Sequence, residues 1–389
     1  MTARGHGTFP EAPIGRLTRL DGLRGVLAVY VMLGHAAPFI RWPPGVGPFI
    51  EAVVGHGMAA VDLFFALSGL VIVQSMARFE GRTAPFFAAR ARRLLPIYLV
   101  VLAASIPILT AGSPFALLPW LHPGDAAHQI WEVGLPHPLA AHIALHLALI
   151  QGALPRAMLP DAEFSLLGPA WSLSTEWQFY ALIALLMTRI GNDRRGLARL
   201  TVIFLALALA GRAYAGLAPP SWQFGRAFLP NQAAYFALGI AAARLWRGSD
   251  GTRLFLVVLA VAMGLGLSHS TGSGAIGKAL PPLTWALAIV AQRAPANRLI
   301  RPFARVLGHP VLLWLGAISY PLYLANEPVQ RTLALLFGGA DPAQFALLWG
   351  GLALAVPIGL AALLHHAVER RFMRQRRRSL QAAAPAAAP

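Results

Sequence analysis

The sequence predicts an all-α, polytopic integral membrane protein with about ten transmembrane helices, one interfacial or re-entrant helix and both termini in the cytoplasm. Of the 389 residues, 57% are hydrophobic and only 12% are charged, whereas a soluble domain usually carries about a quarter charged residues. The net charge of +17 comes from basic side chains between the apolar segments, so it indicates membrane topology and not a nucleic-acid partner. The chain has no Cys, which excludes disulfides, thiolate nucleophiles and Cys-ligated metals.

Ten apolar segments are candidates for membrane-spanning helices, each of which needs roughly 20 mostly apolar residues. They are 22–41, 57–77, 94–111, 171–188, 198–217, 231–243, 254–269, 279–292, 309–335 and 344–366. With both ends cytoplasmic, this number of spans puts every Arg cluster on the inner side, as the positive-inside rule requires. Of the 32 basic residues, six are exceptions, namely Arg41, Arg156, Arg212, Arg226, Lys278 and Arg331.

Segment 138–153 is also apolar, but counting it as a span would move every later Arg cluster to the outside. We therefore expect an interfacial or re-entrant helix there, with His142 and His146 on one face because they are four residues apart. The preceding segment 112–138 is rich in Pro and is expected to be a loop. The chain thus divides into a cytoplasmic N-terminal segment (1–20), a transmembrane domain (21–370) and a basic, then Ala/Pro-rich cytoplasmic tail (371–389).

Arg24 and His35 form the first polar pair expected inside the apolar bundle. They are eleven residues apart in a predicted helix, which places them on one face with a rise of about 16 Å between them. Arg24 would lie at the inner surface and His35 in the outer half of the membrane. Ionisable side chains in spans are costly and are therefore functional candidates. The alternative is an Arg that marks topology and a core His that bonds a carbonyl.

Two acidic residues are expected at a similar depth. Asp62 and Glu176 each follow the outer start of a span by about 7–8 Å, close to the level of His35. Ser68 precedes a Gly in the Asp62 segment, a pattern that also suits close helix packing, and Trp171 begins the Glu176 segment. Asp62 could equally be a helix-start carboxylate, and the ionisable groups could form a purely structural network.

Two more segments carry candidate functional side chains. Arg90 and Arg93 lie one helical turn apart on the cytoplasmic side and could clamp phosphate, although topology alone would explain them. Segment 316–328, with Tyr320 and Asn326, combines a Pro kink with polar groups near the outer end of its span. The simplest interpretation of this segment is a kinked helix whose polar side chains anchor it. The His residues are too loosely spaced to predict a metal site.

These segments, taken in order, resemble the membrane acyltransferase family 3, the multi-span O-acyltransferases that modify glycans and some small molecules. The matching segments are 20–35 with its Arg-x10-His spacing, 57–69, 90–98, 171–180 and 319–324. The resemblance covers about residues 20–370 and implies an acyl-CoA co-substrate, no permanently bound cofactor and a catalytic role for His35 supported by Arg24. Family members often have His at the position of Asn326. No C-terminal SGNH hydrolase-like domain is expected.

The candidate site therefore has three groups of residues. They are the catalytic His35, Glu176 and Asp62, the donor-binding Arg24, Arg90 and Arg93, and the supporting Ser68, Trp171, Tyr320 and Asn326.

In the expected reaction, His35 acts as general base on an acceptor hydroxyl, which attacks the thioester of acyl-CoA. Glu176 or Asp62 would orient the imidazole and stabilise its charged form; a covalent acyl-imidazole or acyl-Ser intermediate is the alternative. The expected partners are acyl-CoA, membrane lipid and a glycan, lipid-linked saccharide or small-molecule acceptor, in a bacterial cytoplasmic (inner) membrane. The alternative function is a transporter or flippase for a glycan or lipid, in which Arg24 and these residues line a conduction path.

Overall fold

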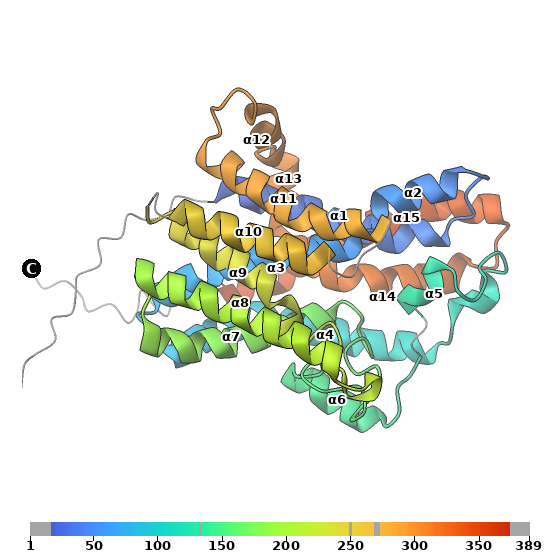
Figure 1. Ribbon diagram of the computed structural model, residues 1–389. Helices are drawn as coiled ribbons and strands as arrows, with labels where there is room; N and C mark the ends of the chain where they lie inside the picture. Colours follow the sequence, from blue (N-terminus) through green and yellow to red (C-terminus); the bar gives the residue numbers. More distant parts are fainter. Residues whose placement is uncertain (1–16, 132–133, 249–250, 268–272, 374–389) are drawn as a thin grey trace, which may run out of the picture.

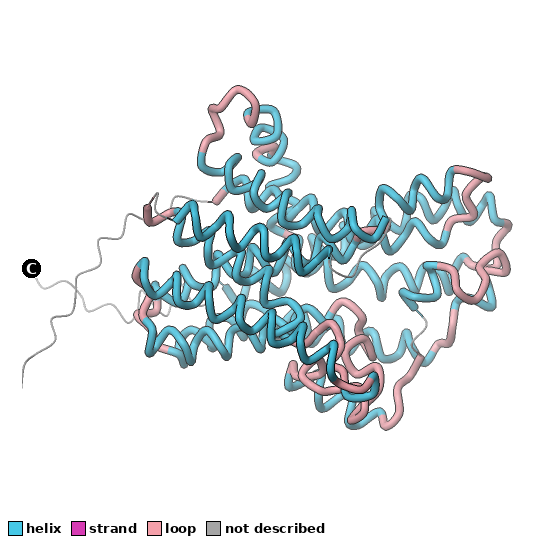
Figure 2. Tube along the Cα trace, in the orientation of Figure 1, coloured by secondary structure: helices cyan, strands magenta, loops and turns pink. Residues whose placement is uncertain are grey.

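The computed structural model describes residues 17–131, 134–248, 251–267 and 273–373, which form a bundle of helices without a β-sheet (Figures 1 and 2). Figure 1 shows the long helices side by side with roughly parallel axes. The α-helices are α1 (Thr18–Ala36), α2 (Val46–Val54), α3 (Gly57–Arg78), α4 (Thr83–Thr110), α5 (Ala126–Trp131), α6 (Leu139–Ala148), α7 (Ala170–Ile190), α8 (Arg194–Leu217), α9 (Leu229–Leu245), α10 (Gly251–Leu267), α11 (Ser273–Arg293), α12 (Arg301–Leu307), α13 (Pro310–Ala317), α14 (Ser319–Phe337) and α15 (Pro342–Leu364). A π-helical turn, η4 (His365–Glu369), follows α15. The predicted all-α class is confirmed.

Five of these segments are long and apolar enough to cross a membrane. They are Thr18–Phe39, Val46–Arg78, Thr83–Thr110, Arg194–Leu217 and Pro342–Met373. Each of the other expected spans also coincides with a helix, but α9 and α10 have 17 residues each, and α7 and α14 carry several polar side chains. The number of spans and their direction remain predictions. The N-terminal segment before residue 17 and the tail after residue 373 lie outside the described residues.

The helix boundaries differ from the expectation at two places that matter for the site. α4 begins at Thr83 and not near residue 94, so Arg90 and Arg93 are helical. The expected span 309–335 is broken at Ile318 into α13 and α14. The break lies within segment 316–328, where we expected a Pro kink; it precedes Pro321, and Pro328 lies inside α14. α2 and α12 had no predicted counterpart, and α5 lies within the expected loop 112–138.

Helix α3 lies in the core of the bundle, with most of its residues buried against α1, α7, α9 and α11. Its closest approach is to α9, where Gly69 faces the backbone of Phe236 and Gly239. A Cβ on either glycine would collide with the backbone of the other helix. Small residues permit such close contact between membrane helices, where packing and not hydrophobic exclusion of water holds them together. This contact fixes the position of Ser68, one residue before Gly69.

Side-chain hydrogen bonds hold the C-terminal end of α1 against α14 and α15. Trp349 Nε1 donates to the Ala36 carbonyl at 2.8 Å. Gln330 Nε2 donates to the carbonyls of Met32 at 3.2 Å and Ala353 at 3.1 Å. Both side chains are buried, where an unpaired polar group would be costly. These bonds fix the turn of α1 that carries His35.

The segment between α6 and α7 is anchored at both ends. His142 Nδ1 and His146 Nε2 lie 2.8 and 3.2 Å from Ser165 Oγ, which confirms that both imidazoles lie on one face of α6. Glu163 Oε2 accepts a hydrogen bond from the Ala227 amide at 2.8 Å. Burial raises the pKa of the Glu163 carboxyl, and this hydrogen bond opposes the effect. The N-terminal end of α7 therefore has a fixed position.

Candidate active site

His35 lies at the C-terminal end of α1 and is oriented by Asn326 of α14. His35 Nδ1 is 2.8 Å from Asn326 Oδ1. The Asn326 amide nitrogen donates to the carbonyls of Leu322 at 3.1 Å and Tyr323 at 2.7 Å, which assigns the amide oxygen to the histidine. Because that oxygen can only accept, Nδ1 of the neutral imidazole carries the hydrogen. Nε2 therefore keeps a free lone pair, as a general base requires.

His35 borders a cavity of about 600 Å³, here called the histidine cavity. Its wall includes residues of α1, α2, α3, α5 and α14 and of the loop before α7. The ionisable side chains that line it, besides His35, are Arg41, Glu51, Asp125, Glu327 and Arg331. Trp171, a predicted supporting residue, also lines this cavity and is buried. The cavity is large enough for a small organic substrate.

A second cavity of about 130 Å³, here called the basic cavity, is lined by the three predicted donor-binding residues Arg24, Arg90 and Arg93. Arg90 and Arg93 share the cavity-facing side of α4, whereas Arg92 is exposed and bonds the Ala88 carbonyl at 3.0 Å. Arg90 also contacts Ser75 Oγ. Three guanidinium groups around one small space suit bidentate recognition of phosphate.

Glu176 lines the basic cavity and not the histidine cavity. Its carboxylate accepts hydrogen bonds from Ser68 Oγ and, at 2.6 Å, from the Tyr180 hydroxyl. It also interacts electrostatically with Arg24. Glu176 and the predicted supporting residue Ser68 thus form one polar cluster beside the arginines.

The two cavities share the side chains of Val61 and Tyr323 in their linings. The arginines therefore lie on one side of this junction and His35 on the other. Tyr320, which we expected near the outer end of its span, lines the basic cavity, and its hydroxyl donates to the Leu94 carbonyl at 2.7 Å.

Asp62 lines neither cavity. It is buried with 2% of its surface exposed, and it faces Tyr235 of α9, with Lys278 and Arg226 among the charges that act on it. The structure thus does not bring Asp62 to the imidazole, and the position next to His35 Nδ1 is taken by Asn326.

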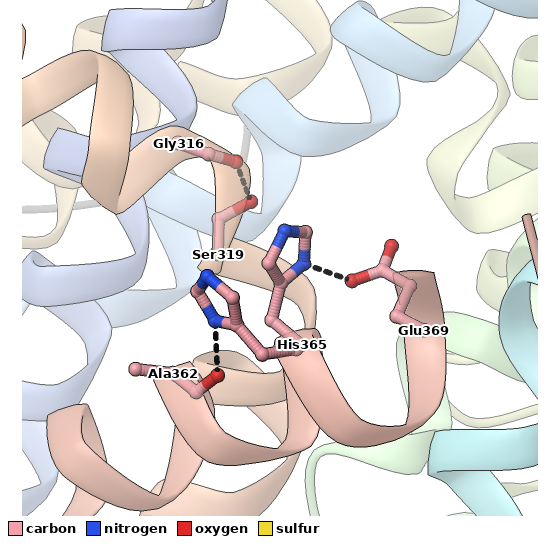
Figure 3. A network of polar contacts seen from close by, with 6 residues as sticks. Gly316, Ser319, Ala362, His365 and Glu369 are labelled. Carbon is pink, nitrogen blue, oxygen red and sulfur yellow. Dashed lines mark hydrogen bonds and ion pairs between the residues drawn. The ribbon is translucent and has the colours of Figure 1, made fainter. Parts of the chain in front are cut away.

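Sequence reasoning did not single out several residues of the site. Glu327 and Arg331 line the histidine cavity. The signal that could have found them is the four-residue interval from Tyr323 to Glu327 and again from Glu327 to Arg331. At the other end of the site, His365 Nδ1 lies 2.7 Å from Glu369 Oε2 in the π-helical turn (Figure 3). Glu369 is buried and acts electrostatically on Arg24.

An apolar helical bundle that holds an oriented imidazole at the wall of one cavity and three arginines at an adjoining one has the arrangement expected of a membrane-embedded group-transfer enzyme. The acyltransferase domain model of acyltransferase family 3 matches residues 17–366. The chain therefore belongs to the acyltransferase 3 family, and it is an acyltransferase.

Curated relatives agree with this assignment. Acyltransferase MdmB of Streptomyces mycarofaciens is 29% identical over 395 residues, which cover 92% of each chain. Exopolysaccharide production protein ExoZ of Rhizobium meliloti is 28% identical over 82% of this chain and 91% of its own. A protein of Komagataeibacter xylinus named "Putative membrane-bound transacylase BcsY" is 28% identical over 63% of this chain and 52% of its own. No solved structure matches the chain significantly.

The hydrogen bond from His35 to Asn326 can be tested by substitution. Asn326→Ala removes the acceptor that fixes the Nδ1–H tautomer, so we expect kcat for acyl transfer to fall roughly five- to tenfold, the value of a hydrogen bond of about 1–1.5 kcal/mol. Thr332→Val is the matched control because it removes a side-chain hydrogen bond within α14, to the Pro328 carbonyl, that does not touch His35 or α1. Equal kcat in the Asn326 variant and the parent would contradict this role of the amide.

Proposed function

We propose that the protein transfers an acyl group, with acetyl the expected one, from acyl-CoA to a hydroxyl group of a glycan or glycolipid. The observation that carries this proposal is the pair of adjoining cavities, with three arginines in one and His35 at the wall of the other. A donor with a phosphate-bearing head and a thioester at the end of a long arm fits this arrangement. Its head would stay at the arginines while its thioester reaches the imidazole.

The distance between Arg24 and His35 supports this placement of the head and the thioester of the donor. Arg24 and His35 are eleven residues apart on α1, which corresponds to about 16 Å along the helix. An extended pantetheine arm spans a distance of this order. The acyl group would pass the junction at Val61 and Tyr323, so the charged head need not enter the apolar part of the bundle, where its desolvation would be costly.

The proposed chemistry is a direct transfer. Nε2 of His35 removes the proton from the acceptor hydroxyl, and the resulting oxygen attacks the thioester carbonyl. The tetrahedral intermediate collapses as the C–S bond breaks, and the imidazolium returns its proton to the departing thiolate of CoA. Asn326 keeps the imidazole in the productive tautomer throughout. Glu176, beside Arg24, balances part of the positive charge of the basic cavity.

We place the basic cavity at the cytoplasmic side of a bacterial inner membrane, in a topology with ten spans and both termini inside. The Arg clusters at the ends of α3, α7 and α9 support this orientation. In this topology α6 does not cross, which its length of ten residues favours. The histidine cavity then opens toward the outer side, where an exported or lipid-linked glycan is available. The name of the exopolysaccharide relative supports a glycan acceptor.

The catalytic role of His35 predicts a large loss of rate without a loss of folding. His35→Ala should reduce acyl transfer by about 10²–10⁴-fold, the usual cost of removing a general base. His142→Ala is the control, because Ser165 keeps its bonds to His146 and Ala162, and it should retain most activity. The measurement is release of CoA thiol by purified protein. Activity of the His35 variant within a few fold of the parent would rule out the general-base role.

Donor recognition predicts a selective effect on one substrate. Arg90→Ala combined with Arg93→Ala should raise KM for acetyl-CoA much more than KM for the acceptor, because both arginines line the basic cavity and neither lines the histidine cavity. In sealed vesicles of known orientation, transfer should require acetyl-CoA on the face that carries the basic cavity. The same rate with the donor supplied only to the opposite face would contradict the arrangement.

The proposed topology predicts which turns a membrane-impermeant reagent can reach. Single cysteines introduced at Asn192, between α7 and α8, and at Ala218, after α8, should be labelled from the cytoplasmic and the outer side respectively. The absence of native Cys makes the labelling specific. If the cysteine at Asn192 reacted only from outside in intact cells, the direction of every later span would have to be reversed.

A further inference from the structure

One side of α14 presents a polar stripe to the histidine cavity. Tyr323, Glu327 and Arg331 follow each other at four-residue intervals, which places them on one face of the helix, and all three line the cavity. Asn326 lies next to this face and bonds His35. The general base and the stripe are therefore positioned by the same helix.

Arg331 is a buried cation with unused hydrogen-bonding capacity in this cavity. Its side chain is 5% exposed, and Nη2 donates to the Gly112 carbonyl at 3.2 Å. Among the residues that the structure describes, Nε has no hydrogen-bond partner. A buried unpaired donor costs about 1–3 kcal/mol. The guanidinium group, which lines the cavity, is therefore the natural donor to an oxygen atom of a bound molecule.

Glu327 is held next to Arg331 and against the loop before α7. The two side chains attract each other electrostatically. The Glu327 carboxylate also lies directly on the backbone of Gly168, where an added Cβ would come within 3.0 Å of its Cδ and Oε1. Only a glycine leaves this space free, so the carboxylate position depends on Gly168.

Aromatic rings complete the lining of the histidine cavity. Four of the ten tryptophans in the chain line it, namely Trp42, Trp120, Trp131 and Trp171. Indole rings offer broad apolar faces together with a polar N–H. Sugar rings match such a surface, because their C–H faces are apolar and their edges carry hydroxyl groups.

We propose that Glu327 and Arg331 form the binding site for a saccharide acceptor, an inference that rests on the proposed transfer to a glycan hydroxyl. A carboxylate only accepts hydrogen bonds and a guanidinium only donates them, whereas a hydroxyl does both. One sugar hydroxyl therefore bridges the pair: its oxygen accepts from the Arg331 guanidinium, and its proton is donated to Glu327. The bound ring then presents another hydroxyl to Nε2 of His35.

Binding is measured separately from transfer, by quenching of tryptophan fluorescence in the purified full-length chain. The probes are the methyl glycosides of glucose, galactose and mannose, and cyclohexanol serves as a ring of similar size with a single hydroxyl. We expect saturable quenching by at least one glycoside and none by cyclohexanol. Glu327→Gln should raise the Kd of that glycoside roughly tenfold, as loss of a hydrogen bond to a charged group predicts. KM for acetyl-CoA should remain within twofold of the parent.

Gly168→Ala provides a second test that leaves the carboxylate in the chain. The added Cβ displaces the flexible end of Glu327 and not a backbone atom, so the protein should fold while the glycoside Kd rises as in Glu327→Gln. The double variant should bind no more weakly than the weaker single variant, because both changes remove one interaction. Glu80→Gln, an exposed carboxylate elsewhere, and Gly350→Ala, with nothing near its Cβ position, are the controls.

The saccharide-binding site and the proposed acyl transfer can fail independently in these experiments. The proposed binding site is wrong if no glycoside binds the parent, or if Glu327→Gln and Gly168→Ala leave the glycoside Kd unchanged. It is also wrong if KM for acetyl-CoA rises in these variants by the same factor as the glycoside Kd. Glycoside binding that depends on Glu327, together with no acyl transfer to any glycan or glycoside, would support the site and contradict the proposed transfer.

Discussion

The hydrogen bond between His35 and Asn326 is the interaction on which the arrangement of the site depends. It joins residues 291 positions apart in the sequence and decides which imidazole nitrogen is free. The bonds of Gln330 and Trp349 to the α1 backbone keep α1, α14 and α15 in the register that this contact requires. Asn326, Gln330 and Trp349 are buried, so their polar groups cannot exchange these partners for water, and each contact supports the others.

Charge divides the site into two parts. The basic cavity holds three arginines with Glu176 as the nearby counter-charge, whereas the histidine cavity holds both signs and several indole rings. A polyanionic donor head is attracted to the first part, and a neutral polyhydroxylated acceptor suits the second. A conduction path for one solute would be expected to offer similar chemistry along its length. The difference between the two cavities fits the proposed reaction, in which the acyl group passes the Val61 and Tyr323 junction to reach the acceptor at His35.

Hydropathy and charge patterning predicted the helices well, because the apolar character of a helix in such a bundle is visible in its local sequence. The shared face of Arg90 and Arg93 followed from helical spacing alone. Helical rise predicted a common depth for Asp62, Glu176 and His35, but Glu176 lies in the basic cavity with Arg24, at the other end of α1 from His35. Asp62 faces α9, Glu176 faces the arginines, and His35 pairs with a residue far along the chain. The break at Ile318 lies in the segment where a Pro kink was expected, but its position also depends on packing of α13 against α1, where Gly316 contacts the Asp21 backbone.

Glu327 lies one position after Asn326, so the two side chains leave α14 about 100° apart. One is directed to the imidazole and the other to the cavity that the imidazole borders. In the proposed reaction, the same helix therefore sets the tautomer of the base and the place of the acceptor, and the distance between them cannot vary independently. Separation of α14 from α13 at Ile318 lets α14 take this position while α13 packs on α1. The break thus lets α13 pack on α1 while α14 carries both Asn326 and Glu327 to the histidine cavity.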